Sequence, residues 1–167
     1  LSFGYDRLKQ TGESGARKKT SNQWFETQDS ISYWDDFSKQ KIVWGEISDK
    51  SKFALDEQGL FPEATTFFMI GKKLPYLLAI LNSKLGEWLF NQVGTTTGMG
   101  TNRWKKYKLE TLLVKTPTQK EEIDINQLIQ QITDSEFYDQ SIVKEIDNVI
   151  YRMYNLTSEE ILFIENL

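Results

Sequence analysis

The sequence contains neither histidine nor cysteine among its 167 residues. Without them, the chain cannot supply a Ser-His-Asp triad, a thiolate nucleophile, or the nitrogen and sulfur ligands that zinc prefers. It also lacks a run of about 18 apolar residues, the length that a membrane-spanning helix needs. We therefore expect a cytoplasmic protein without a membrane partner, and the absence of cysteine is consistent with a reducing compartment.

The common catalytic motifs are missing as well. A magnesium-dependent nuclease needs carboxylates and a lysine, but none of the 24 acidic residues is followed two positions later by lysine. The chain has no Asn-Pro-Pro-aromatic methyltransferase motif, no P-loop and no dinucleotide fingerprint. We expect no catalytic residue, metal ion or cofactor in this chain. One alternative stays open, a nuclease with an atypical carboxylate cluster of Asp29, Asp35, Asp36 and Glu46.

The net charge of −4 conceals a division along the chain. Residues 1–120 hold 18 Lys and Arg against 13 Asp and Glu, a net charge of +5, whereas residues 121–167 hold 2 against 11, a net charge of −9. Binding to a nucleic acid depends on the local field of one face, so an acidic overall isoelectric point does not exclude it. An ordinary solvated surface beside an acidic helix explains the same numbers, and both interpretations stay open.

Hydrophobic patterning predicts an α+β fold, with a mostly antiparallel sheet, a packed amphipathic helix and a C-terminal helical segment. Aromatic and β-branched residues indicate strands in the segments 23–28, 41–48, 52–56, 60–61, 65–70 and 109–114. Leucines at three- and four-residue spacing predict one helix from Leu74 to about Val93, with Asn82, Lys84 and Glu87 on its solvated side. We expect the core to contain Trp24, Trp44, Phe53 and Phe67.

The acidic tail is predicted to be helical. Apolar stripes at helical spacing run through Ile125–Ile132 and Ile142–Tyr154, and Thr157 with Glu160 forms a capping box for a last helix. We expect two parts, a domain over residues 1–120 with a partly ordered arm at 1–22, and an acidic helical tail over 121–167 that packs on or beside it.

The segment 94–108, GTTTGMGTNRWKKYK, combines three glycines, four threonines and four basic residues. Glycines allow positive φ and close approach to a ligand, and threonine hydroxyls reach a short distance. Arg103 can pair with a guanine edge and Asn102 with adenine, while Lys105, Lys106 and Lys108 supply charges for phosphates. Trp104 and Tyr107 are expected to anchor the segment in the core. A plain basic surface loop remains the alternative, and nothing in the composition selects DNA over RNA.

The order of segments resembles the TaqI-like C-terminal specificity domain, the target recognition domain of single-chain type II enzymes that fuse methyltransferase and endonuclease. The resemblance covers nearly the whole chain, and its matching stretches are Gly15–Thr20, Trp24–Asp29, Lys41–Trp44 with Glu46–Ser48, Leu77–Leu85, the Gly-Thr segment ending in Asn102–Lys106, and Asp147–Glu160.

The resemblance implies a module that recognises a short sequence in double-stranded DNA and holds the duplex for a methyltransferase domain of the same parent chain. In that family the methyltransferase moves a methyl group from S-adenosylmethionine to adenine N6, and a parent that also cleaves would need Mg²⁺. Neither activity is expected here.

On side-chain chemistry we predict DNA contacts from both the basic cluster near the N-terminus and the Gly-Thr segment. The predicted residues are Arg17, Lys18, Lys19, Gln28, Thr95, Thr96, Thr97, Thr101, Asn102, Arg103, Lys105, Lys106 and Lys108. The alternative function is a protein-interaction or scaffolding domain that acts through the acidic helical tail.

Overall fold

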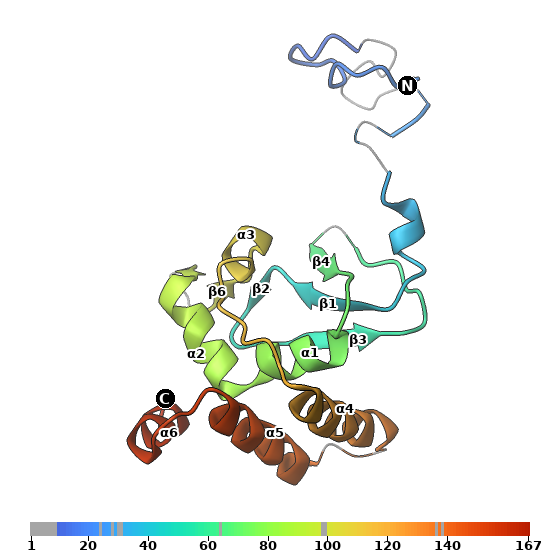
Figure 1. The fold of residues 1–167 in the computed structure, drawn as a ribbon. Helices are drawn as coiled ribbons and strands as arrows, with labels where there is room; N and C mark the ends of the chain where they lie inside the picture. Colours follow the sequence, from blue (N-terminus) through green and yellow to red (C-terminus); the bar gives the residue numbers. More distant parts are fainter. Residues whose placement is uncertain are drawn as a thin grey trace. The chain divides into compact units, whose positions relative to one another are not determined.

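The computed structural model describes residues 10–23, 25–27, 29, 32–63, 65–97, 100–135, 137 and 139–167. It divides the chain into two compact units, Leu1–Phe37 and Ser38–Leu167. The second unit holds all the described β-strands and α-helices, and its helical tail shares one hydrophobic core with its sheet (Figure 1). The predicted α+β class, with antiparallel sheets and a C-terminal helical segment, is confirmed.

The first unit consists of turns and loops in its described residues, with one 3₁₀ turn, η1, at Trp34–Asp36. The strand predicted over residues 23–28 is wrong for the described part of that segment, which forms a turn closed by a hydrogen bond from Glu26 N–H to the Gln23 carbonyl (2.9 Å). The Arg17 guanidinium takes the carbonyls of Gln23 and Glu26 as acceptors, so they are not available to a β-ladder. Trp24, predicted as core, lies outside the described residues.

The main sheet of the second unit has strands β1 (Lys41–Gly45), β3 (Phe53–Asp56) and β4 (Thr66–Met69), in the order β3-β1-β4. All pairings are antiparallel, and Trp44 lies opposite Phe53 on one side and Phe67 on the other. Both ring pairs have centroids 5.6 Å apart. The predicted core positions of Trp44 and Phe53 are confirmed, and Phe67 is partly buried against them.

The strand predicted at 60–61 is wrong, because Leu60 and Phe61 are exposed and outside the sheet. The turn that precedes them is held by a buried ion pair between Lys41 and Asp56, which lie opposite each other in the β1–β3 ladder. The Asp56 carboxylate also accepts hydrogen bonds from the backbone N–H groups of Gln58 (2.8 Å) and Leu60 (2.9 Å). These bonds use the polar groups of the turn and leave Leu60 without a strand partner.

The predicted helix over residues 74–93 is two helices, α1 (Leu74–Asn82) and α2 (Lys84–Val93). The break lies at Ser83, whose hydroxyl accepts a hydrogen bond from Gly86 N–H (2.9 Å) and donates one to the Ile80 carbonyl (2.7 Å). A Cβ on Gly86 would overlap the carbonyl oxygen of Ile80, so only glycine fits where α2 turns away from α1. Helix α1 is apolar on most of its surface because it lies between the sheet and the tail helices.

Asn82 and Lys84 are exposed, as predicted, and Glu87 is partly buried, but all three also make contacts outside their own helices. The Asn82 amide bonds both the N–H (3.0 Å) and the carbonyl (2.9 Å) of Phe53 at the edge of β3. The Glu87 carboxylate accepts from the backbone and hydroxyl of Ser51, and Lys84 forms an ion pair with Glu165 of the tail. The corner between α1 and α2 therefore joins the sheet to the tail.

The helical tail is confirmed as α4 (Gln119–Asp134), α5 (Gln140–Met153) and α6 (Ser158–Glu165). The capping box of Thr157 and Glu160 is present, and a second one starts α4. Helix α4 packs on α1 and α5, and α2 packs on α5 and α6, so the sheet, the α1–α2 pair and the tail form successive layers (Figure 1).

Among the described residues, three ion pairs cross from the basic part of the chain to the tail. They join Lys73 to Glu122, Lys84 to Glu165 and Lys115 to Glu121. These ion pairs therefore neutralise part of the positive charge of residues 1–120 and part of the negative charge of the tail.

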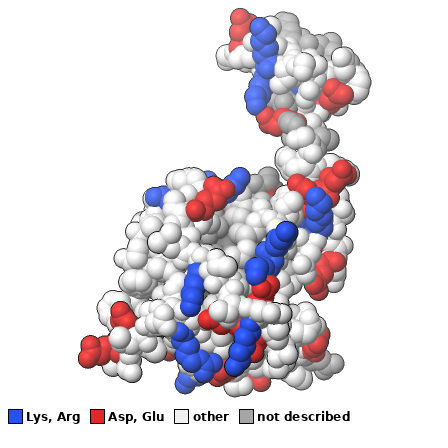
Figure 2. Space-filling view, viewed as in Figure 1, with Lys and Arg blue, Asp and Glu red and all other residues white. Residues whose placement is uncertain are grey.

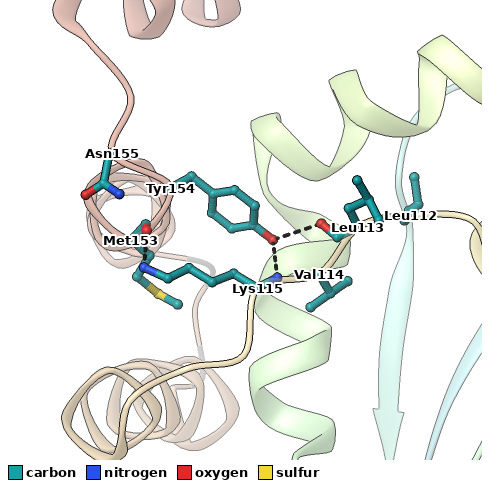
Figure 3. Close-up of a pocket in the computed structure, with 7 residues that line it drawn as sticks. All are labelled: Leu112, Leu113, Val114, Lys115, Met153, Tyr154 and Asn155. Carbon is teal, nitrogen blue, oxygen red and sulfur yellow. Dashed lines mark hydrogen bonds between the residues drawn. The ribbon is translucent and has the colours of Figure 1, made fainter.

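The strand predicted over residues 109–114 is wrong. Lys106–Leu109 forms the short helix α3, and the chain then runs without a β-ladder to α4. Tyr154 holds this connection instead, because its hydroxyl accepts from Lys115 N–H (3.0 Å) and donates to the Leu113 carbonyl (3.4 Å) (Figure 3). A hollow of about 490 Å³ lies between this connection and the end of α5.

Candidate nucleic-acid interface

A second, smaller sheet presents the polar residues of the Gly-Thr segment. Its strands are β2 (Ile47–Ser48), β6 (Asn102–Arg103) and β5 (Thr95–Thr96), in the order β2-β6-β5. The antiparallel register places Ile47, Arg103 and Thr95 in one row, and Ser48, Asn102 and Thr96 in the next. Since directly opposed residues share a face and successive residues alternate, Arg103 and Asn102 lie on opposite faces of this sheet.

The hairpin between β5 and β6 is closed by its threonines. Thr97 N–H donates to the Thr101 carbonyl (2.9 Å), and the two hydroxyls are 2.6 Å apart. Gly100 has a positive φ of 74°, as the predicted use of glycine requires, whereas Gly94 has an extended backbone. At Gly94 the requirement is space, because a Cβ there would lie 2.8 Å from the Phe90 ring.

Trp104 anchors the small sheet to the core, as predicted. It is 2% exposed, and its ring stacks on Phe90 at 3.9 Å and meets Phe53 edge-on at 5.5 Å. Its backbone N–H donates to the Glu46 carbonyl (2.7 Å), and its own carbonyl accepts from the Trp44 indole (2.8 Å). Arg103, which precedes it, therefore extends from a rigid base.

Arg103 and Lys105 share one carboxylate partner, Glu46. The Glu46 Oε1 atom lies 3.1 Å from Nη1 of Arg103 and 2.6 Å from Nζ of Lys105. The hydrogen bond from Lys105, together with the charges of both basic groups, holds the pKa of Glu46 below its ordinary value although desolvation acts to raise it. The side chain of Arg103 is 46% exposed and that of Lys105 is 32% exposed. The group carries a net charge of +1 and remains open to a ligand.

The other residues predicted in this segment have separate surroundings. Thr95 and Thr96 are exposed, while the Asn102 amide donates to Asn91 Oδ1 (2.7 Å). Nζ of Lys106 lies 3.6 Å from Oε1 of Glu110, four residues later, and Nζ of Lys108 lies 5.8 Å from the Tyr107 ring centroid. Tyr107 is 60% exposed, so its predicted role as a core anchor is wrong. Trp104 anchors the segment in the core, and Leu109 at the end of the short helix α3 is buried there as well.

Basic and acidic side chains lie beside one another over α3 and β6 rather than forming a patch of one sign (Figure 2). Sequence reasoning did not place Glu46, Ile47 and Ser48 beside the Gly-Thr segment. Their signal was weak, because a two-residue strand has no periodicity, although the stretch Glu46–Ser48 belongs to the resemblance.

The basic cluster near the N-terminus belongs to the first unit. Arg17 is 1% exposed and bonds backbone carbonyls, which corrects the prediction that it is a surface cation for DNA. Lys18 is exposed and pairs with Asp29, and Lys19 is exposed. Gln28 lies outside the described residues.

The described carboxylates of the nuclease alternative do not form a metal site. Among the residues that the structure describes, no group of three or more Asp, Glu, His or Cys is placed so that it could hold a metal ion. Glu46 is instead engaged by two basic side chains. No helix among the described residues is long and apolar enough to cross a bilayer.

The chain belongs to the TaqI-like C-terminal specificity domain family, whose family model matches residues 5–114, about two thirds of the sequence. This confirms the resemblance over residues 5–114, and the stretch Asp147–Glu160 lies outside the match. A specificity domain of this class recognises DNA sequence in restriction-modification systems and is not itself catalytic. The matched residues include the whole hairpin and Trp104, whereas α4, α5 and α6 lie beyond them. No curated protein matches the chain.

Proposed function

We propose that the small sheet and α3 form the surface with which this specificity domain reads a short target in the major groove of double-stranded DNA. The observation that carries this proposal is the attachment of the exposed β5–β6 hairpin to the core through Trp104. A base-reading side chain needs a fixed origin, because a bidentate contact tolerates little error in position. Arg103 has that origin and retains almost half of its side-chain surface.

The contacts divide by chemistry. Arg103 reads a guanine edge. Asn102, predicted from its side chain to contact adenine, lies on the opposite face of the small sheet, where its amide bonds Asn91, and it is not assigned to this surface. Thr95, Thr96, Lys106 and Lys108 bond phosphates and fix the register of the duplex, which carries no sequence information by itself. Lys18 and Lys19 of the first unit add phosphate contacts. This sorting follows from exposure and side-chain type.

The domain acts, in this proposal, with an adenine-N6 methyltransferase of the same parent chain. That partner supplies S-adenosylmethionine chemistry and flips the target base, while this domain holds the flanking duplex. The support is the family membership together with the absence of a methyltransferase motif from this sequence. Methylation by the parent chain is tested by incubating it with labelled S-adenosylmethionine and a duplex that holds the selected motif, and locating N6-methyladenine.

The first experiment is selection from random duplexes at low salt, followed by titration of the bound motif with salt. We expect a short motif and a steep fall of affinity with salt, because phosphate contacts release counterions. Arg103→Ala should relax one position of the motif and weaken binding by about 1–3 kcal/mol. Arg152→Ala is the matched control, since Arg152 is an exposed arginine that also pairs with a glutamate, Glu145, but lies on α5.

Two results would contradict this proposal. An equal loss on every sequence for Arg103→Ala would remove its base-reading role. No binding to any duplex at low salt would favour the alternative, in which the acidic helical tail binds a protein partner.

A further inference from the structure

Glu46 has a firmly positioned backbone beside the candidate interface. Its backbone N–H donates to the Thr65 carbonyl (3.0 Å) and its carbonyl accepts from Trp104 N–H (2.7 Å), so both of its backbone polar groups are fixed. The residue joins β1 of the main sheet to β2 of the small one. Its carboxylate consequently starts from a rigid backbone next to Arg103.

The Glu46–Arg103 pair places a hydrogen-bond acceptor, the carboxylate, beside the N–H donors of the guanidinium. The ion pairs of Glu46 with Arg103 and Lys105 both end on Oε1, and no hydrogen bond from a described residue reaches Oε2. Within the described residues, Nη2 of Arg103 has no partner either. The side chain of Glu46 is 23% exposed, so a ligand in contact with Arg103 can also reach the carboxylate.

This arrangement matches one base pair better than the others. In the major groove, guanine presents two adjacent acceptors, N7 and O6, and its cytosine partner presents the N4 amino donor beside them. An A·T pair would instead set the adenine N6 donor against the guanidinium. An acceptor next to a two-donor fork is thus complementary to a G·C edge.

We propose that Glu46 is a second base-reading residue, which accepts a hydrogen bond from cytosine N4 of the same G·C pair whose guanine Arg103 contacts. The proposal rests on the proposed function, and it adds the identity of one base pair and a residue that reads it. Lys105 acts as a positioning residue. Its ammonium group holds the carboxylate beside Arg103, and its charge offsets the repulsion between Glu46 and the phosphates.

The test uses duplexes that carry the selected motif with single atoms removed. One series replaces each guanine with 7-deazaguanine, and another replaces each cytosine with an analogue that lacks the N4 amino group. Wild-type protein should lose about 5- to 150-fold in affinity at one and the same base pair in both series. Glu46→Ala should become insensitive to loss of the N4 group there, while it stays sensitive to 7-deazaguanine.

Glu110→Ala is the matched control, because Glu110 is an acid on the same surface that pairs with Lys106. Its loss should raise affinity for all sequences alike and leave both analogue effects unchanged. Circular dichroism and thermal melting verify that each variant folds. If Glu46→Ala does not fold, Glu46→Gln retains the length of the side chain and should reduce the N4 effect.

The proposal is overturned if wild-type protein ignores the cytosine N4 group at the pair that Arg103 contacts. It is also overturned if Glu46→Ala keeps the full N4 effect and merely binds every duplex more tightly, since Glu46 would then only restrain the two basic residues. Absence of any selected motif is a different result, because it removes the proposed function itself.

Discussion

The indole Nε1 of Trp44 donates a hydrogen bond to the main-chain carbonyl of Trp104, at 2.8 Å and across 60 residues of sequence. Trp44 lies in β1, the central strand of the main sheet, between Phe53 and Phe67. Trp104 directly follows β6, the strand of Asn102 and Arg103. One buried bond therefore links the hydrophobic core to the candidate reading strand. Both indoles are nearly inaccessible to solvent, so water does not compete for it.

Trp104 should be essential for both folding and DNA binding. Replacement by alanine removes the stack on Phe90 and leaves a cavity, which costs about 3–5 kcal/mol of unfolding free energy. Trp104→Phe should cost much less, because it keeps an aromatic ring and removes an indole N–H that has no partner among the described residues. Urea unfolding and duplex binding measure both effects, and equal losses for the two variants would show that the ring does not anchor the strand.

Lys106 should contribute charge without sequence preference. Its side chain is exposed, and its contact with Glu110 is a weak surface pair of 3.6 Å. Lys106→Ala should therefore weaken all duplexes alike and lower the slope of log affinity against log salt by about one. Lys144→Ala, an exposed lysine of α5, should leave the slope unchanged. A change of motif in Lys106→Ala would instead give this residue a base contact.

The buried pair of Lys41 and Asp56 should be sensitive to the loss of one partner. Lys41→Met leaves the Asp56 carboxylate buried without its cation, and we expect a loss of about 3–5 kcal/mol at neutral pH. The double variant Lys41→Met with Asp56→Asn should recover much of this loss, because no isolated charge remains.

The same pair should respond to acid in a defined direction. Burial acts to raise the pKa of Asp56, but the hydrogen bonds from Lys41, Gln58 and Leu60 outweigh it and hold that pKa below its ordinary value. A lowered folded-state pKa gives stability that is present above the unfolded value and is lost as pH falls. The difference in unfolding free energy between wild type and Lys41→Met, measured in urea, should become smaller below about pH 4. A gap that does not depend on pH would assign the loss to packing alone.

Asp147 should have the opposite pH dependence. Burial raises its pKa to about 6, although its carboxylate accepts from Lys84 N–H (3.0 Å). The folded state then binds more protons than the unfolded state between about pH 4 and 6, so its contribution to stability falls as pH rises through that range.

Asp147→Asn keeps an acceptor for Lys84 N–H and removes the buried charge. We expect its unfolding free energy, measured in urea, to exceed that of wild type by up to about 3 kcal/mol at pH 7.5 and by little at pH 3.5. A variant less stable than wild type at pH 7.5 would mean that the ionised carboxylate stabilises the start of α2.

The elements with long periodic patterns could be predicted from the sequence. The tail helices have regular stripes and a capping box, and the strand around Trp44 is rich in aromatic and β-branched residues. The pattern over residues 74–93 also indicated helix, but the break at Ser83 depends on Gly86 meeting Ile80 and on Asp147 reaching Lys84 N–H. Contacts between distant residues leave no trace in local periodicity.

The candidate site shows the same division. Composition alone identified the Gly-Thr segment, the basic residues and Trp104, because bidentate donors, glycines and a buried indole are properties of residue type. The sequence also excluded chemistry that needs histidine or cysteine from this chain. It could not separate Arg17, which bonds the carbonyls of its own loop, from Lys18 and Lys19, since all three are basic neighbours.

Only the tertiary structure brought Glu46 to Arg103, 57 residues away, and turned Tyr107 outward while Trp104 went in. Strand pairing decides which side chains become neighbours, and it depends on the register between segments that are far apart in the chain. The sequence thus determined the chemistry available to this domain. The tertiary structure decided which of those groups share a surface, because the packing of Trp104 into the core sets the position of the strand that carries them.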